Sequence, residues 1–191
     1  MRLIGHPDEW AGELAAVLVA PAVSPEVRRL VLRQLVSRVA GCAMEDVRIV
    51  HAPGRAPVLV EPRGLVLSSA SRDGVAAVAV GRGPLGVDIE AVEPGREPPW
   101  NVLHERERAL LARLSDGERE REFARIWAAK EAYLKAIGLG LAREPAGFAI
   151  LPGEGGTCRA EDPERPGSAR IWTALLSQNA RQFAVALAEL G

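Results

Sequence analysis

Two carboxylates lie two residues apart in the segment GVDIE, at Asp88 and Glu90. If this segment is a strand, successive side chains alternate between its faces, so both carboxylates lie on the same face. Two neighbouring acids repel each other unless a cation or a basic side chain lies between them. Mg²⁺ takes one or two such carboxylates and completes its shell with water and phosphate. The pair therefore indicates a metal site, or an edge strand whose charges discourage aggregation.

The lysines of this chain are unusually placed. Lysine and arginine together number 24, and the only two lysines, Lys130 and Lys135, lie within IWAAKEAYLKAIGLGL. Lysine is a compact charge that can release its proton, whereas arginine stays protonated at any working pH. The two positions therefore indicate chemistry that arginine cannot do, or a coding bias that left two lysines by chance.

Glu131 and Lys135 share one face of the helix expected here, because residues four apart are neighbours on a helix. The simpler interpretation is a surface Glu–Lys pair that stabilises the helix by about 0.3–0.5 kcal/mol. The alternative is that Glu131 joins Asp88 and Glu90 at a metal ion, with Lys135 beside it on a bound phosphate. The two motifs together favour this alternative more than either does alone.

Length and composition limit the setting of these side chains. A chain of 191 residues with 48% hydrophobic content can bury one sizeable core, or two small halves packed together. The formal net charge of -1 gives no basic field for nucleic acid. Cys42 and Cys158 are far apart and lack zinc-site spacing. The apolar stretch 15–23 is too short to span a bilayer, and no signal peptide precedes it, so we expect a soluble cytoplasmic protein.

Three segments have helical patterns. Ser24 is a good N-cap for a helix with Pro25 at its first position and Gly41 at its end. We expect its buried face to hold Val27, Leu30, Val31, Leu35 and Val39. Residues 104–114 and 118–138 predict two further helices, and the second of these carries both lysines.

Short β signals lie between these helices and after them. They predict strands at residues 47–50, 65–69, 75–80, 85–90, 148–150, 169–176 and 183–190, with a loop at 152–167. The strand–turn–strand pattern of the middle of the chain returns near its C-terminus. We therefore predict an α+β fold with two pseudo-symmetric halves, 1–91 and 92–191, each a small antiparallel sheet packed with a long helix. The crevice between the halves would be a natural ligand site.

The paired motif resembles a known family. GVDIE followed by F-x-x-I-W-x-x-K-E-A-x-x-K-x-x-G-x-G-L is similar to the signature of 4'-phosphopantetheinyl transferases of the broad-specificity, surfactin-synthetase-activating type. The first helix, the segment GRAPVL and the closing FAVALA also resemble that family. The likeness runs from about Ser24 to the end of the chain, and the family's two pseudo-symmetric halves match the internal repeat.

The resemblance implies a monomer that transfers phosphopantetheine from coenzyme A (CoA) to a serine of an apo acyl or peptidyl carrier protein. By matching position, Asp88, Glu90 and Glu131 would hold Mg²⁺ against the pyrophosphate of CoA. Glu131 would also take the serine proton as general base. Lys135 would stabilise the charge on the leaving 3',5'-ADP, and Lys130 would contact phosphate nearby.

The resemblance also assigns residues to the 3'-phosphate end of CoA. The family usually has S-H-S where this chain reads Ser69-Ala70-Ser71, and alanine has no hydrogen bond to offer. Ser69 and Ser71 remain the matching CoA-binding residues. Arg55 in GRAP matches the family's G-K-P lysine, although GRAP is one residue longer.

Two hypotheses therefore stay open. The first is an active transferase with a rearranged 3'-phosphate pocket, in which Arg28, Arg29 or Arg72 replaces the missing histidine. The second is a repurposed or inactive relative that binds a carrier protein, or acts on its cargo, without transferring phosphopantetheine. The complete acidic and lysine set favours the first hypothesis, whereas Ala70 and a non-basic N-terminal segment favour the second.

Overall fold

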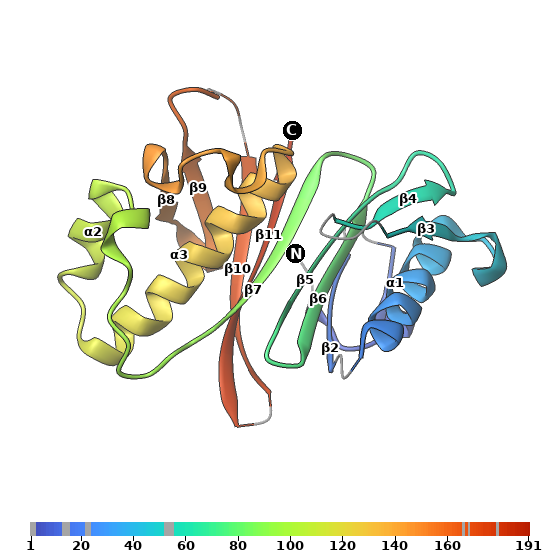
Figure 1. Ribbon diagram of the computed structural model, residues 1–191, viewed down its shortest axis with the longest axis horizontal. Helices are drawn as coiled ribbons and strands as arrows, with labels where there is room; N and C mark the ends of the chain where they lie inside the picture. The colour runs from blue at the N-terminus through green and yellow to red at the C-terminus, as the bar shows by residue number, and fades with distance from the viewer. Residues whose placement is uncertain are drawn as a thin grey trace.

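The computed structural model describes residues 3–12, 16–21, 24–51, 56–165, 167, 169–178 and 180–191. Two sheets dominate it, and each carries one long helix on its outer face (Figure 1). The predicted α+β class with a sheet and a long helix in each half is confirmed.

The first sheet has the strand order β1-β2-β6-β5. Its strands pair antiparallel, except that β1 and β2 run parallel. The elements of this part are β1 (Leu3–Ile4), β2 (Ala16–Pro21), α1 (Pro25–Ala40), β3 (Arg48–Val50), β4 (Val58–Glu61), β5 (Val66–Arg72) and β6 (Val75–Gly81). Strands β3 and β4 form a separate two-stranded sheet.

The second sheet has the order β7-β11-β10-β9-β8 and is antiparallel throughout. Its part of the chain holds β7 (Leu85–Ala91), α2 (Glu105–Leu111), α3 (Asp116–Ala136), β8 (Ala149–Pro152), β9 (Thr157–Glu161), β10 (Ala169–Gln178) and β11 (Arg181–Leu190). Short 3-10 helices lie at Pro7–Glu9, Met44–Asp46, Trp100–Val102, Gly140–Ala142, Pro145–Gly147 and Glu154–Gly156.

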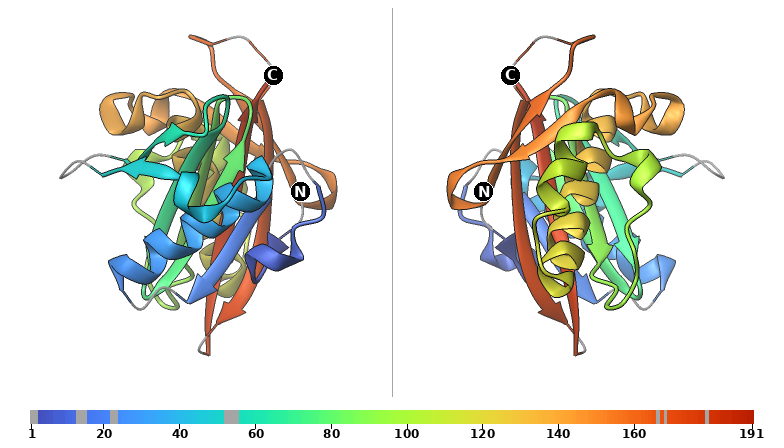
Figure 2. Two further views of the ribbon diagram at one scale, coloured as in Figure 1. Left: turned by 90° about the vertical axis from the view of Figure 1, so that its right-hand side faces the viewer. Right: turned by 90° about the vertical axis from the view of Figure 1, so that its left-hand side faces the viewer.

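The fold has four layers, which are α1, the first sheet, the second sheet and α3, and an apolar cluster lies between each neighbouring pair. One cluster lies between α1 and the first sheet, a second between the two sheets, and a third between the second sheet and α3. Strand β11 shows how the pattern works: Phe183, Val185 and Leu187 face the first sheet, while Ala184 and Ala186 face α3. The side views show the two long helices on the outside of this stack (Figure 2).

Helix α1 begins and ends as predicted, but it buries a different stripe. The Ser24 hydroxyl accepts the Val27 N–H at 3.3 Å, and Gly41 ends the helix in the left-handed region at φ 67°. The buried side chains are Leu32, Leu35 and Val36. Val27 and Leu30, which were expected inside, are 38% and 47% exposed. The segment has enough apolar residues for two overlapping stripes, and its contact with the sheet selects one.

The predicted loop at 152–167 is wrong in part, because it contains β9. This strand pairs with β8 and β10, so backbone hydrogen bonds order a segment whose composition indicates a loop. Strand β2 lies within the apolar stretch 15–23. Its residues Ala16–Pro21 pair with β6, and this strand was not predicted. The short strands β1 and β4 were not predicted either.

Strand β7 connects the two parts. It is hydrogen-bonded to β11 in the second sheet, yet the Val87 N–H is donated to the Ser68 hydroxyl of β5 at 3.0 Å. Hydrogen bonding thus assigns β7 to the second sheet, although β7 precedes the predicted boundary between residues 91 and 92. That boundary stays a prediction.

Both cysteines are free thiols. Among the described residues, no helix has the length and apolar character needed to cross a membrane.

Candidate active site

A glycine lets α3 approach β7 closely. A Cβ on Gly86 would lie 2.0 Å from the Ala132 carbonyl oxygen and 2.7 Å from the Ala136 nitrogen. These are backbone atoms and cannot rotate away, so any other residue would push the helix off the strand. The close approach brings the last turns of α3, with Lys135, over the face of β7 that carries Asp88.

Lys135 and Asp88 form the central contact of the site. The Lys135 Nζ donates to Asp88 Oδ1 at 2.7 Å and to the Val87 carbonyl at 3.1 Å. Asp88 is only 6% exposed, and burial raises the pKa of its carboxyl despite the ammonium group beside it. Its other oxygen, Oδ2, is buried and has no hydrogen-bond partner within the described ranges. A buried carboxylate oxygen left in this way favours a further cation.

Glu90 and Glu131 share the neighbourhood of Asp88. Burial, then repulsion from Asp88, raises the pKa of Glu90 to about 7, while the Arg72 guanidinium opposes this rise. Burial and repulsion from Asp88 also raise the pKa of Glu131. The strand period and the helix spacing predicted that these carboxylates are neighbours, and Asp88 lies close enough to repel both Glu90 and Glu131.

The donor set fits a hard divalent cation. As the side chains stand, no three Asp, Glu, His or Cys residues of the described chain converge closely enough to hold a metal, and Lys135 engages one Asp88 oxygen. The free Asp88 Oδ2 and the mutual repulsion of the carboxylates are nevertheless what a Mg²⁺ ion would relieve. Asp88, Glu90 and Glu131 remain the predicted ligands.

Lys130 does not join this cluster. Its side chain is 0% exposed, and its Nζ contacts Glu107 Oε1 at 2.9 Å and the carbonyls of Pro145 and Phe148 at 2.7 and 2.6 Å. An ammonium group has three N–H donors, and these three acceptors use them all. We therefore withdraw Lys130 from the predicted phosphate contacts, because it is an ion-paired residue of the core.

The predicted CoA residues lie on the other side of the first sheet. On β5, Ala70 packs into the cluster between the sheets. Ser69 and Ser71 point the opposite way because side chains alternate along a strand. The Ser71 hydroxyl accepts a hydrogen bond from Arg28 of α1 at 2.5 Å. Arg55 lies outside the described residues.

Of the other arginines considered for CoA, neither reaches these serines in the contacts found among the described residues. Arg29 pairs with Glu26 at 2.8 Å on the same helix. Arg72 points toward the second sheet and pairs with Glu93 at 2.9 Å and Glu90 at 3.7 Å. Arg28 is therefore the arginine that the fold places at the Ser69-Ala70-Ser71 segment.

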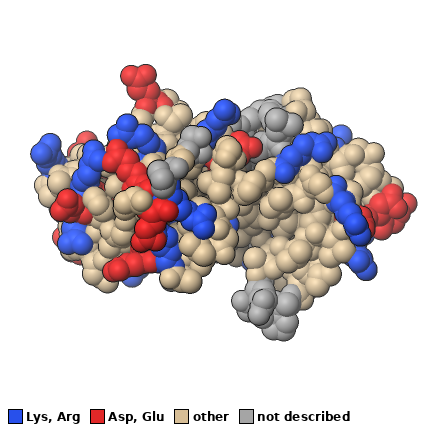
Figure 3. Space-filling view, turned by 90° about the horizontal axis from the view of Figure 1, so that it is seen from above, with Lys and Arg blue, Asp and Glu red and all other residues tan. Residues whose placement is uncertain are grey.

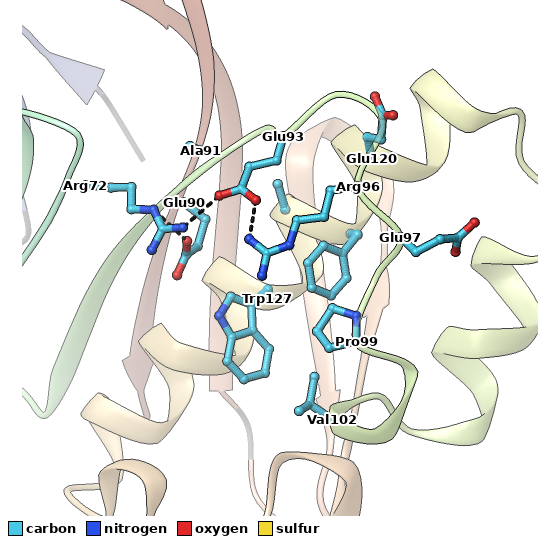
Figure 4. A pocket seen from close by; sticks show the side chains of 12 residues that line it. Arg72, Glu90, Ala91, Glu93, Arg96, Glu97, Pro99, Val102, Glu120 and Trp127 are labelled. Atoms are coloured by element: carbon cyan, nitrogen blue, oxygen red, sulfur yellow. Dashed lines mark hydrogen bonds and ion pairs between the residues drawn. The ribbon is translucent and has the colours of Figure 1, made fainter.

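A cavity of about 250 Å³ opens beside Glu90 (Figure 4). Its walls come from the end of β7, the segment after it and the first half of α3. The apolar side is formed by Pro99, Val102, Phe123, Ala124 and Trp127, and the charged side by Arg72, Glu90, Glu93, Arg96, Glu97 and Glu120. Glu93 and Arg96 were not predicted as site residues, because the Pro-rich connection that carries them has no periodic signal that predicts where its side chains point.

Charge is unevenly distributed over the molecule. On the face seen from above, acidic and basic side chains alternate over the second sheet and its helices, while on the part with α1 the charged side chains are mostly basic and are separated by wider uncharged areas (Figure 3).

Comparison with known proteins places this geometry in a family. Residues 84–188 match the 4'-phosphopantetheinyl transferase superfamily. The matched segment runs from the turn before β7 into the last residues of the closing strand β11, up to residue 188, and includes Asp88, Glu90, Glu131 and Lys135. It covers more than half of the chain, so the chain belongs to this superfamily, which is a family of transferases.

Two relatives are named as 4'-phosphopantetheinyl transferases. The 4'-phosphopantetheinyl transferase HetI of Nostoc sp. strain PCC 7120 is 27% identical over an alignment of 172 residues, and the match covers 79% of this chain and 73% of HetI. The protein slr0495 of Synechocystis sp. strain PCC 6803, named as a candidate transferase of this kind, is 31% identical over 121 residues. That match spans 59% of this chain and about half, 48%, of the relative.

Solved structures show a more distant likeness. The holo-(acyl-carrier-protein) synthase of Bacillus anthracis, solved in complex with CoA (3',5'-ADP), is 23% identical, with a TM-score of 0.42 over 56% of this chain and 94% of that chain. The enzyme from Thermotoga maritima is 28% identical, with a TM-score of 0.40 over 56% of this chain and 64% of that chain. Scores at this level support no statement about activity.

Proposed function

We propose that this protein transfers 4'-phosphopantetheine from CoA to a serine of an apo acyl or peptidyl carrier protein, with Mg²⁺ as cofactor. The observation that carries the proposal is the Lys135–Asp88 contact at 2.7 Å, set beside Glu90 and Glu131 in a member of this superfamily. A protein that only binds its partner has no physical need for such a repulsive cluster.

The proposed reaction moves one group and one proton. The serine oxygen of the carrier forms a bond to the β-phosphorus of CoA, and the bond from that phosphorus to 3',5'-ADP breaks. Glu131 accepts the serine proton, and its raised pKa makes it a better base than an ordinary carboxylate. Lys135 donates a hydrogen bond or its proton to the leaving phosphate.

Asp88, Glu90 and Glu131 would hold Mg²⁺ through their oxygens. The ion supplies neutralisation of the pyrophosphate charge and orientation for in-line displacement. Lys135 already lies at the edge of this cluster, with its side chain 31% exposed, so it can reach a phosphate without leaving its place on α3.

The 3'-phosphate of CoA would meet Arg28, Ser71 and Ser69 at the α1 side of β5. Arg28 supplies a charged donor that Ala70 cannot, and a charge-assisted hydrogen bond contributes about 1.5–3 kcal/mol. Arg28→Met should therefore weaken binding of CoA more than binding of dephospho-CoA. Equal weakening of both ligands in calorimetry would remove Arg28 from the 3'-phosphate site.

The transferase proposal is tested by mass. The purified protein is incubated with CoA, Mg²⁺ and several apo carrier proteins, and the intact mass of each carrier is measured. We expect a gain of one phosphopantetheine on at least one carrier, lost with Glu131→Gln. Glu122→Gln is the matched control, because Glu122 lies on the same helix but pairs with Arg125. No gain on any carrier, while a known transferase works alongside, would contradict the proposal.

A second candidate function is supported by Ala70. The side chain at this position packs between the sheets and offers no donor to a phosphate, which fits a relative that binds a carrier protein without modifying it. The same experiment separates the two functions. Binding of a carrier without a mass change, seen by size-exclusion chromatography, would support the second.

A further inference from the structure

Arg72 joins the two sheets at the candidate metal site. It is the last residue of β5 in the first sheet, and its guanidinium reaches over the end of β7 in the second. Its Nε lies 3.7 Å from Glu90 Oε2, and its terminal nitrogen donates to Glu93 Oε1 at 2.9 Å (Figure 4). One arginine therefore touches a predicted metal ligand and a neighbouring carboxylate at once.

The charges of the site are nearly balanced without a metal. Three carboxylates, Asp88, Glu90 and Glu131, face two basic side chains, Lys135 on Asp88 and Arg72 on Glu90. Lys135 belongs to the helix of the site, but Arg72 comes from the other sheet. Its contact with Glu90 is the longer of its two, and the buried Nε that makes it has no hydrogen-bond partner among the described residues.

We propose that Arg72 is an internal counter-ion of this site, which screens Glu90 while no divalent cation is bound and moves fully onto Glu93 when a cation binds. This inference rests on the proposed function, because it assigns Asp88, Glu90 and Glu131 to a cation. Arg72 is a positioning residue in this scheme, since it acts on the cation through Glu90 and touches neither the phosphate nor the serine.

Glu93 is suited to receive the arginine. It lies two residues beyond β7, and hydrogen bonds from Arg96 and Arg72 lower its pKa, so it stays a carboxylate. Arg96 contacts the other Glu93 oxygen and holds that side chain in place. The guanidinium can therefore leave Glu90 without losing its stronger partner. The release requires only a small movement, because both partners already lie within 4 Å of Arg72.

The consequence is a cation affinity lower than the carboxylates alone would give. A cation that approaches Glu90 is repelled by the Arg72 guanidinium and must displace it from the Glu90 carboxylate. In a variant without the charge of Arg72, this repulsion is absent. Exposed or half-exposed ion pairs contribute about 0.2–1 kcal/mol. Because 1.4 kcal/mol is a factor of ten, loss of Arg72 should tighten cation binding by up to roughly fivefold.

The test is titration of Mn²⁺ into the full chain without CoA, followed by calorimetry or by the electron paramagnetic resonance of free Mn²⁺. Arg72→Met keeps most of the side-chain length and removes the charge. Arg96→Met is the matched control, because Arg96 also binds Glu93 but makes no contact with Glu90 in the described part of the chain. We expect Arg72→Met to bind Mn²⁺ more tightly than the unaltered protein, with Arg72→Lys close to the unaltered protein and Arg96→Met unchanged within twofold.

Equal or weaker Mn²⁺ binding by a folded Arg72→Met protein would overturn the counter-ion role, as would an equal gain in Arg96→Met or no Mn²⁺ binding at all. If Arg72→Met does not fold, Arg72→Gln takes its place in the same titration with the same expected gain. The mass assay reports separately on the proposed function. Phosphopantetheine transfer with unchanged Mn²⁺ binding in the variant rejects only the counter-ion, whereas tighter Mn²⁺ binding without transfer rejects only the transferase.

Discussion

The two lysines of α3 lie five residues apart and have opposite surroundings. Lys130 is completely buried, and its three donors meet Glu107 and two backbone carbonyls. Its partner is equally satisfied, because Glu107 accepts the N–H groups of Ile150 and His104 at 2.6 and 2.9 Å. Lys135 is partly exposed, and its partner Asp88 keeps one buried oxygen without a hydrogen bond among the described residues.

This difference separates a structural charge from one available for chemistry. A buried pair whose every donor and acceptor is used can only hold elements together, here α2, α3 and the start of β8. A pair with an unused oxygen and an exposed ammonium can exchange its partner for a ligand. Residue type and helix are the same in both cases, so the completeness of the hydrogen bonding distinguishes them.

Breaking the buried Lys130–Glu107 pair should have the largest effect on the stability of the protein. Glu107→Ala leaves the Lys130 ammonium without its counter-ion in the core, and such changes destabilise proteins by about 3–5 kcal/mol. Urea unfolding followed by circular dichroism measures this change. The protein that remains folded should transfer phosphopantetheine at the normal rate, and a loss of stability below about 1 kcal/mol would refute a structural role.

Lys135→Met should act on turnover more than on stability. Removing a donor aimed at a developing negative charge costs about a hundred- to a thousandfold in kcat. Lys135→Arg keeps the charge but not the compact shape, so only part of the activity should return. Single-turnover kinetics with a carrier protein measure the effect. If Lys135→Met lowered stability as much as Glu107→Ala and left kcat intact, the two lysines would not differ in role.

Gly86→Ala tests the spacing that gives Lys135 its place. The added Cβ would meet the backbone of α3, and overpacking of this kind destabilises by about 1–3 kcal/mol. Because the shift moves the end of α3 where Lys135 contacts Asp88, kcat should fall as well. Thermal unfolding and the mass assay give the two readouts. Gly83→Ala, at a turn position with its nearest neighbour 3.7 Å away, is the control and should change neither.

The last expected effect is a dependence of stability on pH. The pKa of Glu90 is raised from 4.5 to about 7 in the folded state, so the folded protein binds this proton more tightly than the unfolded chain. Stability should then fall as pH rises from about 4.5 to about 7, and Glu90→Gln should flatten this fall. Urea unfolding at several pH values measures the slope. A slope unchanged by the substitution would mean that Glu90 titrates normally.

Parts of this molecule can be predicted from the sequence because local rules determine them. Strand period and helix spacing are enough to place Asp88 with Glu90, and Glu131 with Lys135, on common faces. The caps of α1 are equally local. Lys130 could not be assigned in this way, because its partner Glu107 is contributed by another helix and only packing brings them together.

Other features depend on contacts between distant segments. Strand β9 has a loop-like composition and is ordered by its neighbours β8 and β10. Arg72 lies directly before the turn at Asp73 and Gly74, and nothing in the spacing of the chain shows that it crosses to Glu90. The sequence therefore predicts which acids share a face, while the basic side chains that pair with them can be identified only from the fold.

The place of β7 in the second sheet has a further consequence. Because it pairs with β11, the acids and both lysines lie on one contiguous segment, whereas Arg28, Ser71 and Arg72 belong to the segment before it. A nick in the turn at residues 82–84 would leave each segment with its own sheet intact. Two separately expressed pieces could then reassemble through the apolar cluster between the sheets, and activity would report their docking.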